Sequence, residues 1–527
     1  MVLVAGMVAG AVLAFGFIRG SADTMVSYAP SDTAVYANLD LAPSGAQQLD
    51  LNGLLGQFPG LSGASRDATI NQWLDSALSP AGLSHTDIRS WLGSQLSLLV
   101  LKSDGATPAE VALLSCTNQV AAQSMFNKFK SGPLGTVQRW TSASYDGVTI
   151  HVGEDSSGDE SVWAITPDTV VIGTTEGAVD EVIDTSQGKH DRLTSAPDYT
   201  AVQARVPSDR IAFLYLDVPA LRALVPSADA AAFASALSGY QGIGEAVVAT
   251  SSGLTVTGTV DFDRSKLSAA ARASLGVAAH ANGALAFVPE RAFGFIAVVG
   301  LPQMLKSLTS LAGSGLGASG SEALQQLGIT GPGGVLSHLT GDAGIEVEQV
   351  PGAQVPSGSL LLATDGSAGV QGFLDRLAET VCSAESSACG SPSPTHTTYR
   401  GVTVSSITIT GVDAAQLSPS WAVDNGWAII ASTPAEVRAV IDAKQGDNIT
   451  TSPAYRTVAG KVGTSNDGMV YLNVHSLVAA IRAVLPPDVQ QAFDDQVAPY
   501  LAPVQAIGSS NTAFSDHIAT TEFILIG

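Results

Sequence analysis

The stretch WAITPDTVVIGTTEGAVDEVIDTSQG at residues 163–188 returns in altered form as WAVDNGWAIIASTPAEVRAVIDAKQG at residues 421–446. The landmarks of the two stretches keep one spacing, because Trp163 and Trp421, like Asp184 and Asp442, are 258 positions apart. Self-similarity at a fixed spacing is the sequence signature of a repeated structural unit. We therefore infer that one ancestral unit occurs twice in this chain.

Further matched blocks lie on both sides of this stretch and keep their order. They pair Tyr145–Ile150 with Tyr399–Val404, Pro197–Tyr199 with Pro453–Tyr455, Tyr215–Leu216 with Tyr471–Leu472, and Gln241–Gly244 with Gln505–Gly508. Chance would not keep so many blocks collinear. The sequence predicts repeat unit 1 over residues 28–263, a linker helix over 264–282 and repeat unit 2 over 283–527.

Within each unit, runs with strand-like alternation are interspersed with runs of helical periodicity. In the first unit the strand-like runs are Thr33–Leu39, Leu96–Leu101, Val148–Val152 and Ala212–Leu216, and the helical ones are Ala68–Leu78, Val120–Lys130, Glu176–Thr185 and Pro219–Val225. Ser251–Gly253 reads as a hairpin turn. We predict an α+β fold in which each unit is a mainly antiparallel sheet with helices packed on one face.

The length, apolar content and charge of the chain limit the kinds of protein that it can be. The 527 residues include 45% hydrophobic and only 13% charged residues, and the net charge is −23. A chain of this length folds as more than one domain, and its apolar content is enough for large cores. An acidic surface repels phosphate backbones, so the sequence argues against nucleic acid as a partner.

The first 22 residues form a separate apolar segment. Residues 1–18 contain no charged side chain, and as a helix they would reach about 27 Å, enough to cross a hydrocarbon core. Small residues at 20–22 leave a removable signal peptide open as the alternative. We predict a transmembrane anchor or signal segment over 1–22, with the protein in the cell membrane as a single-pass chain whose bulk is extracytoplasmic.

Two of the three cysteines stand close together. Cys382 and Cys389 enclose a short polar loop, which favours a local disulfide and an oxidising compartment over a thiol redox pair or a zinc site. Redox pairs favour Cys-x-x-Cys, and no second cysteine pair or histidine cluster completes a zinc site. The third, Cys116, lies in an apolar run and is expected to be a buried small side chain.

Several motifs have both a chemical and a structural interpretation, and the structural one is favoured in each case. Gly315–Gly320 matches the dinucleotide fingerprint but follows a helical run, so a loop is expected. Asp155–Glu160 is acidic but lacks a calcium-loop pattern, so a hairpin tip is expected. Trp163 and Trp421 are expected to pack in the cores. The sequence predicts no catalytic residue, no cofactor-binding residue and no metal ligand.

The paired carboxylates Asp184 and Asp442 each follow Val-Ile at the end of a predicted helix. They are the best duplicated acidic residues of the chain. Equivalent positions in both copies favour a cap or turn role, because catalysis duplicated in both copies is rarer.

The order of these short motifs resembles a known family. Trp91-Leu-Gly93 before a strand, Tyr145-x-Gly-Val, the Trp163 strand pair, Val182-Ile-Asp-x-x-x-Gly188, Pro197-x-Tyr199 and Tyr215-Leu-x-Val218 follow one another as in the bacterial family catalogued as domain of unknown function 3352. The second copy departs at Leu339-Thr-Gly341, which replaces Trp-Leu-Gly. The resemblance implies an N-terminal membrane segment and an extracytoplasmic body, and it brings no assigned activity.

From these features we expect a non-enzymatic envelope protein that binds a ligand or partner. An envelope protein or a hydrophobic ligand is the expected partner, in addition to the membrane. The alternatives are an envelope hydrolase or transferase whose site forms only in three dimensions, and a carrier of hydrophobic molecules.

Overall fold

The structure is a computed structural model. It describes residues 23–63, 65–102, 108–131, 137–156, 158–224, 237–276, 278–301, 334–349, 356–366, 368–384, 389–391, 393–409 and 417–527. The chain divides into two compact units, the first running to Leu267 and taking in residues 515–519, and the second holding the rest from Ser268.

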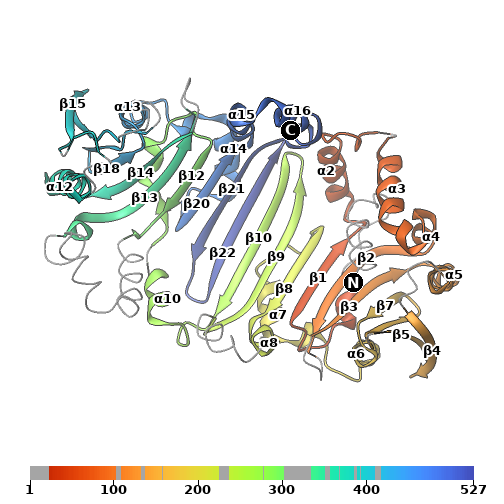
Figure 1. The fold of residues 1–527 in the computed structure, drawn as a ribbon. Coiled ribbons are helices and arrows are strands. Elements are labelled where there is room, and N and C mark those ends of the chain that lie inside the picture. Colours follow the sequence, from red (N-terminus) through yellow and green to blue (C-terminus); the bar gives the residue numbers. More distant parts are fainter. Residues whose placement is uncertain are drawn as a thin grey trace. The chain divides into compact units, whose positions relative to one another are not determined.

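The first unit mixes helices and strands along its length (Figure 1). Its strands are β1 (Val35–Asp40), β2 (Leu92–Leu101), β3 (Ala109–Cys116), β4 (Val137–Tyr145), β5 (Val148–Asp155), β6 (Glu160–Ile165), β7 (Thr169–Gly173), β8 (Ala212–Asp217), β9 (Tyr240–Thr250) and β10 (Gly253–Phe262). Its α-helices are α2 (Gly45–Leu55), α3 (Ser65–Leu78), α4 (His85–Arg89), α5 (Gln119–Lys130), α6 (Glu176–Ser186), α7 (Pro197–Gln203) and α8 (Val218–Leu224).

The second unit has a matching series of elements. Its strands are β11 (His280–Ala281), β12 (Gly294–Val298), β13 (Leu339–Glu348), β14 (Ser357–Thr364), β15 (Thr395–Tyr399), β16 (Val402–Ser406), β17 (Ser420–Asp424), β18 (Trp427–Ala431), β19 (Ser465–Asn466), β20 (Gly468–Asn473), β21 (Val504–Ala513) and β22 (His517–Ile526). Its α-helices are α10 (Ala269–Ser274), α12 (Ala368–Ala384), α13 (Pro434–Ala443), α14 (Pro453–Val462), α15 (Val474–Val484), α16 (Pro487–Gln496) and α17 (Ala498–Leu501).

The two units pair their strands in the same order, and every pairing is antiparallel. In the first unit the order is β4–β5–β6–β7–β3–β2–β1–β8–β9–β10. In the second it is β15–β16–β17–β18–β14–β13–β12–β20–β21. The nine strands of the second series therefore correspond one by one to the strands from β4 to β9 in the first series, which agrees with the repeated motifs of the sequence.

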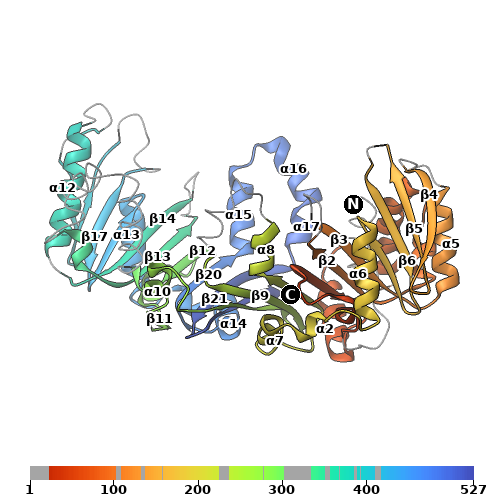
Figure 2. The ribbon, with the colours of Figure 1, turned by 90° about the horizontal axis from the view of Figure 1, so that it is seen from below.

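Helices pack on both faces of part of each sheet, so the expectation of helices on one face is wrong (Figure 2). On β12, β13 and β20 one face is left partly open, where Ile296, Ile345 and Val470 are 46%, 49% and 44% exposed. In β3, Val111 and Leu113 lie in a core with Val179 of α6. Ala112 and Leu114, which alternate with them along the strand, lie in another core with Phe126 of α5. Alternate residues of a strand point to opposite faces. A strand whose run is apolar at nearly every position is therefore buried from both sides.

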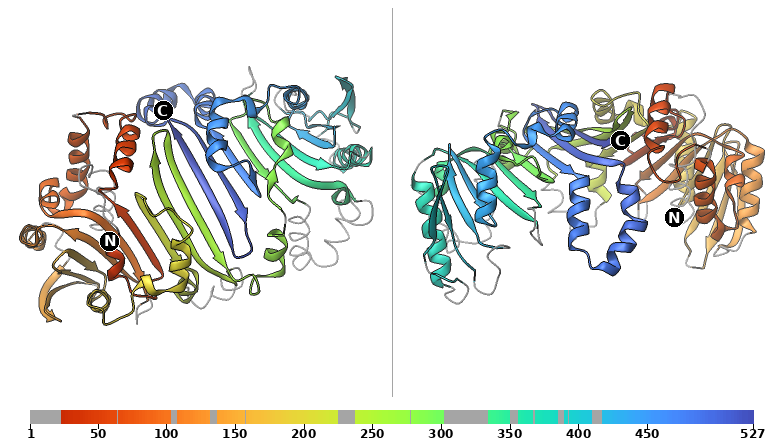
Figure 3. Two further views of the ribbon diagram at one scale, coloured as in Figure 1. Left: turned by 180° about the vertical axis from the view of Figure 1, so that it is seen from behind. Right: turned by 90° about the horizontal axis from the view of Figure 1, so that it is seen from above.

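The second unit has the same two-sided arrangement. The indole Nε1 of Trp421 on β17 donates to Asp375 Oδ1 of α12 at 2.8 Å. The next residue, Ala422, packs in the core that includes Val437 of α13. Figure 2 labels α12 and α13 on opposite sides of β17, and the right-hand view of Figure 3 shows the same helices, teal and blue, from the other side.

The predicted local elements are confirmed where the structure describes them. The helix expected over 120–130 is α5, and the hairpin expected at Ser251–Gly253 joins β9 to β10. The short helix α10 lies within the stretch 264–282 and belongs to the second compact unit. The apolar segment over 1–22 lies outside the described residues. Among the helices that are described, none combines the length and apolar character that a membrane crossing needs.

A matched pair of glycines lets a helix approach the sheet in each unit. A Cβ on Gly244 of β9 would overlap the side chain of Val202 on α7, and a Cβ on Gly508 of β21 would overlap that of Val458 on α14. We predict that Gly508→Ala lowers the unfolding free energy by about 1–3 kcal/mol through overpacking. Urea denaturation followed by circular dichroism measures this.

The matched control is Gly460→Ala in α14, where an added Cβ meets no atom within 4 Å. This change should raise the unfolding free energy by about 0.5–1 kcal/mol, because alanine favours the helix more than glycine. Equal effects of the two changes would contradict the close approach of α14 to β21.

Candidate functional site

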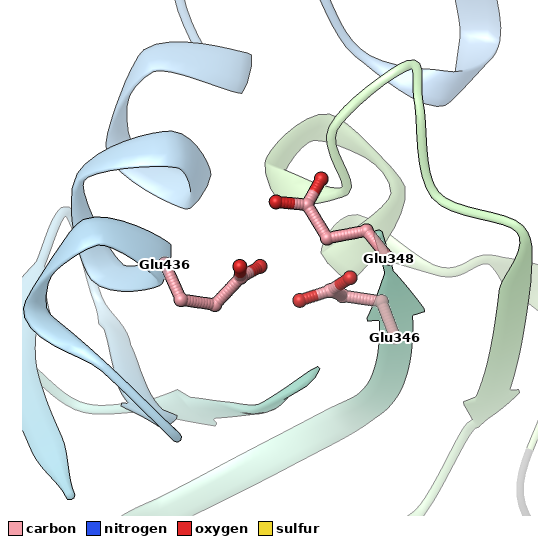
Figure 4. Close-up of side chains that lie close together, drawn as sticks. All are labelled: Glu346, Glu348 and Glu436. Carbon is pink, nitrogen blue, oxygen red and sulfur yellow. The ribbon is translucent and has the colours of Figure 1, made fainter. Parts of the chain in front are cut away.

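Three buried glutamates converge in the second unit (Figure 4). Glu346 and Glu348 lie on β13 and Glu436 lies on α13, and each has 0% of its surface exposed. One carboxylate oxygen from each lies within 4.8 Å of those of the other two. We refer to Glu346, Glu348 and Glu436 as the glutamate cluster.

Local geometry brings the three side chains together. Glu346 and Glu348 are two residues apart on one strand, so their side chains leave the same face of the sheet. Glu436 is the third residue of α13, whose N-cap Thr433 accepts a hydrogen bond from the backbone N–H of Glu436 at 3.2 Å. The Thr-x-x-Glu pattern usually returns the glutamate to the N-cap. Here neither carboxylate oxygen of Glu436 has a hydrogen-bond partner, and the side chain points toward β13 instead.

Few groups compensate the charge of the cluster. Arg291 forms an ion pair with Glu348, and the hydroxyl of Ser359 donates to Glu346 Oε1 at 2.6 Å. The remaining oxygens, Oε2 of Glu346, Oε2 of Glu348 and both oxygens of Glu436, have no donor from outside the cluster in the described structure, and only a proton held between the carboxyl groups could join them by hydrogen bonds. Burying a charged group without partners is strongly unfavourable, so something else must neutralise these oxygens.

Burial also shifts the acidity of the cluster. Loss of hydration raises the pKa of Glu346 to about 7, and the buried Glu436 beside it has a pKa raised further by burial and by the charge of Glu346. The hydrogen bond with Glu348 raises the pKa of Arg291. Carboxyl groups that share a site cannot all ionise unless a positive charge joins them. The cluster therefore has affinity for protons or for a cation.

The first unit has an apolar core at the same place. Tyr36 of β1 and Phe295 of β12 hold the same place in the two units. Tyr36 lies opposite Leu99 on the neighbouring strand and Phe295 lies opposite Glu346, so Leu99 and Glu346 are counterparts. Comparing the register of β2 and β3 with that of β13 and β14, and the third residue of α6 with the third residue of α13, gives five matched positions in all. In the first unit these are Leu99, Leu101, Ala109, Val111 and Ala178, and in the second unit Glu346, Glu348, Ser357, Ser359 and Glu436. All ten residues are buried.

The cluster reaches the surface through Arg291. This arginine has 46% of its side chain exposed, while its partner Glu348 has none. It also lines a surface depression together with Glu290, Arg438, Asp442 and Asp447. The guanidinium of Arg291 therefore links the buried Glu348 to this depression.

The duplicated tryptophans lie in the cores as expected. Trp163 and Trp421 have 2% and 5% of their surface exposed. Trp163 stacks on Phe126 with ring centroids 4.3 Å apart, and His151 stacks on Trp163 at 3.8 Å. Burial and the nearby Lys130 lower the pKa of His151 to about 4. These residues act in packing.

The duplicated aspartates form the same contact in both units. The hydroxyl of Tyr145 donates to Asp184 Oδ2 at 2.6 Å, and that of Tyr399 donates to Asp442 Oδ2 at 2.8 Å. Each tyrosine precedes a tight turn with positive φ, at Asp146 and at Arg400. Asp184 and Asp442 therefore tie a hairpin to a helix rather than cap a helix, and we refer to these two contacts as the Tyr–Asp clasps.

The cysteines and the acidic run predicted from the sequence have structural roles. Cys382 and Cys389 form a disulfide, and Cys116 is a buried free thiol. The acidic run from Asp155 connects β5 to β6, as expected of a hairpin tip. The Gly315–Gly320 stretch lies outside the described residues.

Sequence reasoning missed the glutamate cluster. Glu346 and Glu348 alternate with apolar residues, and that pattern alone fits a strand with a solvated polar face. Aligning β13 with β2 would have placed both glutamates at core leucines of the first copy. The Trp-Leu-Gly motif that marks the start of β2 is replaced by Leu339-Thr-Gly341 at the start of β13, so the two strands could not be aligned by this motif.

We predict a specific pH dependence of stability in the presence of EDTA. Because burial raises the pKa of Glu346 from 4.5 to about 7, the folded state keeps a proton that the unfolded state has lost. The contribution of Glu346 to stability is thus fully present below pH 4.5 and is lost as the pH rises through 7. Glu346→Gln should flatten this fall, measured by urea denaturation between pH 4.5 and 7.5.

Comparing the pH dependence of the unfolding free energy between the unmodified (parent) protein and Glu346→Gln separates the contribution of Glu346 from that of other groups. Asp40 and Asp180 have pKa values raised to about 6, largely by burial, and add the same downward slope to both proteins. Glu348, Glu436, Arg291 and the Ser359 hydroxyl face Glu346 in both as well. Identical slopes for parent and variant would show that Glu346 has an ordinary pKa.

Comparisons with known proteins show the family of this chain, and that family has no assigned activity. No curated protein matches the chain. Two crystal forms of TP0453 are similar at 11% and 10% identity, each with a TM-score of 0.25, over 50% and 46% of this chain and 89% and 81% of theirs. The model of the family described as "Protein of unknown function (DUF3352)" matches residues 1–367 and 351–510. The chain belongs to this family.

Proposed function

We propose that the chain is a non-enzymatic binding protein on the outer side of the cell membrane, and that its second unit carries the binding centre. One observation supports this proposal above the others. Five matched positions are apolar in the first unit and polar in the second, three of them glutamates. The same fold is stable with an apolar core at this place, so its polar counterpart is not needed for folding.

Complete burial of the glutamates favours binding over catalysis. A general acid or base must come within hydrogen-bond reach of the proton that it transfers. All three glutamates have 0% exposure, so a substrate larger than an ion cannot touch them in this conformation. This weakens the alternative of an envelope hydrolase or transferase at this site.

Among the described residues, the larger hollows of about 840, 700 and 670 Å³ are open depressions of the surface, and the more enclosed apolar cavity is small, which disfavours a carrier of hydrophobic molecules. In the first unit a cavity of about 90 Å³ lies among mainly apolar side chains that include Phe126, Trp140 and Trp163. Pockets for small organic ligands measure about 300–1,000 Å³. This cavity is too small for a lipid chain.

The Cys382–Cys389 disulfide supports a place outside the cytoplasm. Disulfides persist in oxidising compartments and are rare where thiol reductants are abundant. The apolar segment over residues 1–18 supplies the means of membrane attachment in this proposal.

We predict that the protein taken directly from cells carries one free thiol. Acid quenching followed by denaturation and alkylation with a maleimide should label Cys116 alone, because Cys382 and Cys389 are joined. After reduction the same protein should take up three labels. Mass spectrometry of the intact chain counts the added groups.

The control variant is Cys382→Ser, which leaves Cys389 without its partner and should take up two labels before reduction. Three labels on the unreduced parent protein would place the chain in a reducing compartment and remove the support for an outward-facing body.

A further inference from the structure

We propose that Glu346, Glu348 and Glu436 bind a hard divalent cation of the Ca²⁺, Mg²⁺ and Mn²⁺ class. This inference rests on the proposed binding function and names the ligand of the same site. It follows from the geometry of the cluster, from its charge and from its unpartnered oxygens.

The separation of the carboxylates fits a single ion. One oxygen from each glutamate lies within 4.8 Å of the oxygens of the other two. Oxygen ligands lie about 2.3–2.6 Å from Ca²⁺, so two ligands on opposite sides of the ion are about 5 Å apart and neighbouring ones are closer. The three oxygens can therefore contact one ion after small side-chain adjustments.

The charge and chemistry of the ligands select the class of ion. Three ionised carboxylates and the Arg291 guanidinium leave two negative charges, which one divalent cation neutralises. The oxygens are hard ligands, and the serine beside them adds another oxygen. Oxygen-only ligand sets suit Ca²⁺, Mg²⁺ and Mn²⁺, whereas Zn²⁺ and Cu²⁺ favour nitrogen and sulfur.

The unpartnered oxygens point to a missing ligand independently of the clustering. Glu436 is fully buried, and within the described structure no group outside the cluster donates a hydrogen bond to either of its oxygens. It gives up the return contact with its N-cap and points into the cluster instead. Buried polar atoms in folded proteins nearly always have a partner, and a buried carboxylate most of all.

The first unit shows that the fold does not require this charge. At the positions of the three glutamates it has Leu99, Leu101 and Ala178, all buried. Replacing a buried charge cluster by apolar residues of similar size is often neutral or stabilising. Retention of three acidic residues in one copy is therefore better explained by a ligand than by packing.

Manganese provides a direct probe. The full-length chain in detergent, stripped with EDTA and dialysed to pH 7.5, is titrated with MnCl₂ while the electron paramagnetic resonance signal of free Mn²⁺ is recorded. We expect saturable uptake of about one equivalent below 1 mM, and release of the Mn²⁺ by CaCl₂. In a parallel thermal melt, 5 mM CaCl₂ should raise the melting temperature by roughly 3 °C or more.

Matched variants assign the binding to the cluster. Glu348→Gln and Glu436→Gln should each weaken Mn²⁺ binding at least roughly tenfold, because each removes one charged ligand. Glu379→Gln makes the same chemical change at an exposed position of α12 and should leave binding unchanged. Circular dichroism confirms that the variants are folded.

A triple variant tests whether loss of binding is separate from loss of the fold. Glu346→Leu, Glu348→Leu and Glu436→Ala together install the residues of the first unit. The protein should fold, bind no Mn²⁺ at the cluster and lose the calcium-dependent rise in melting temperature.

Two results would overturn the cation assignment. One is the absence of saturable Mn²⁺ binding below 1 mM, which would leave the cluster neutralised by protons alone. The other is binding that Glu348→Gln and Glu436→Gln do not change. If the thiol measurement still shows the disulfide formed in cells, the outward-facing binding protein survives either result and only its ligand is wrong. Cation binding by a protein with three free thiols would instead preserve the ligand and refute the location.

Discussion

The buried face of each sheet governs the interior of its unit. In β3, successive residues enter two separate cores, one with α6 and one with α5. The counterpart strands of the second unit have the same pairing order, so their inward positions are fixed by the same geometry. A glutamate at such a position has no route to water. Its carboxylate must find a partner inside the protein, which is why three glutamates at such positions in the second unit form a chemical centre.

Much of the architecture could be predicted from the sequence. Repeated landmarks such as Trp163 and Trp421 revealed the duplication because core aromatics and tight turns tolerate few replacements. The type and approximate extent of α5 and of the β9–β10 hairpin followed from periodicity and turn residues. The covering of both sheet faces did not follow, although the near-continuous apolar run at 109–114 carried the signal.

The candidate site was beyond sequence reasoning for a different physical reason. Glu346 and Glu436 are 90 positions apart, and their approach depends on the placement of α13 over β13. Alternation along β13 indicates which residues share a face, but it does not say which face is inside. In most strands the apolar set faces the core. Here the order is reversed, since Ile345 is 49% exposed while its neighbour Glu346 is buried. The disulfide, by contrast, was predictable because its two cysteines are local.

The Tyr–Asp clasps bear on the history of the chain. The same hydrogen bond joins a hairpin to a helix in both units, although the turn residue beside it is Asp146 in one and Arg400 in the other. A contact shared by both descendants is most simply inherited from their common ancestor. Descent of both units from one single-unit chain that already had this bond would account for its presence in each, although the turn residues beside it differ.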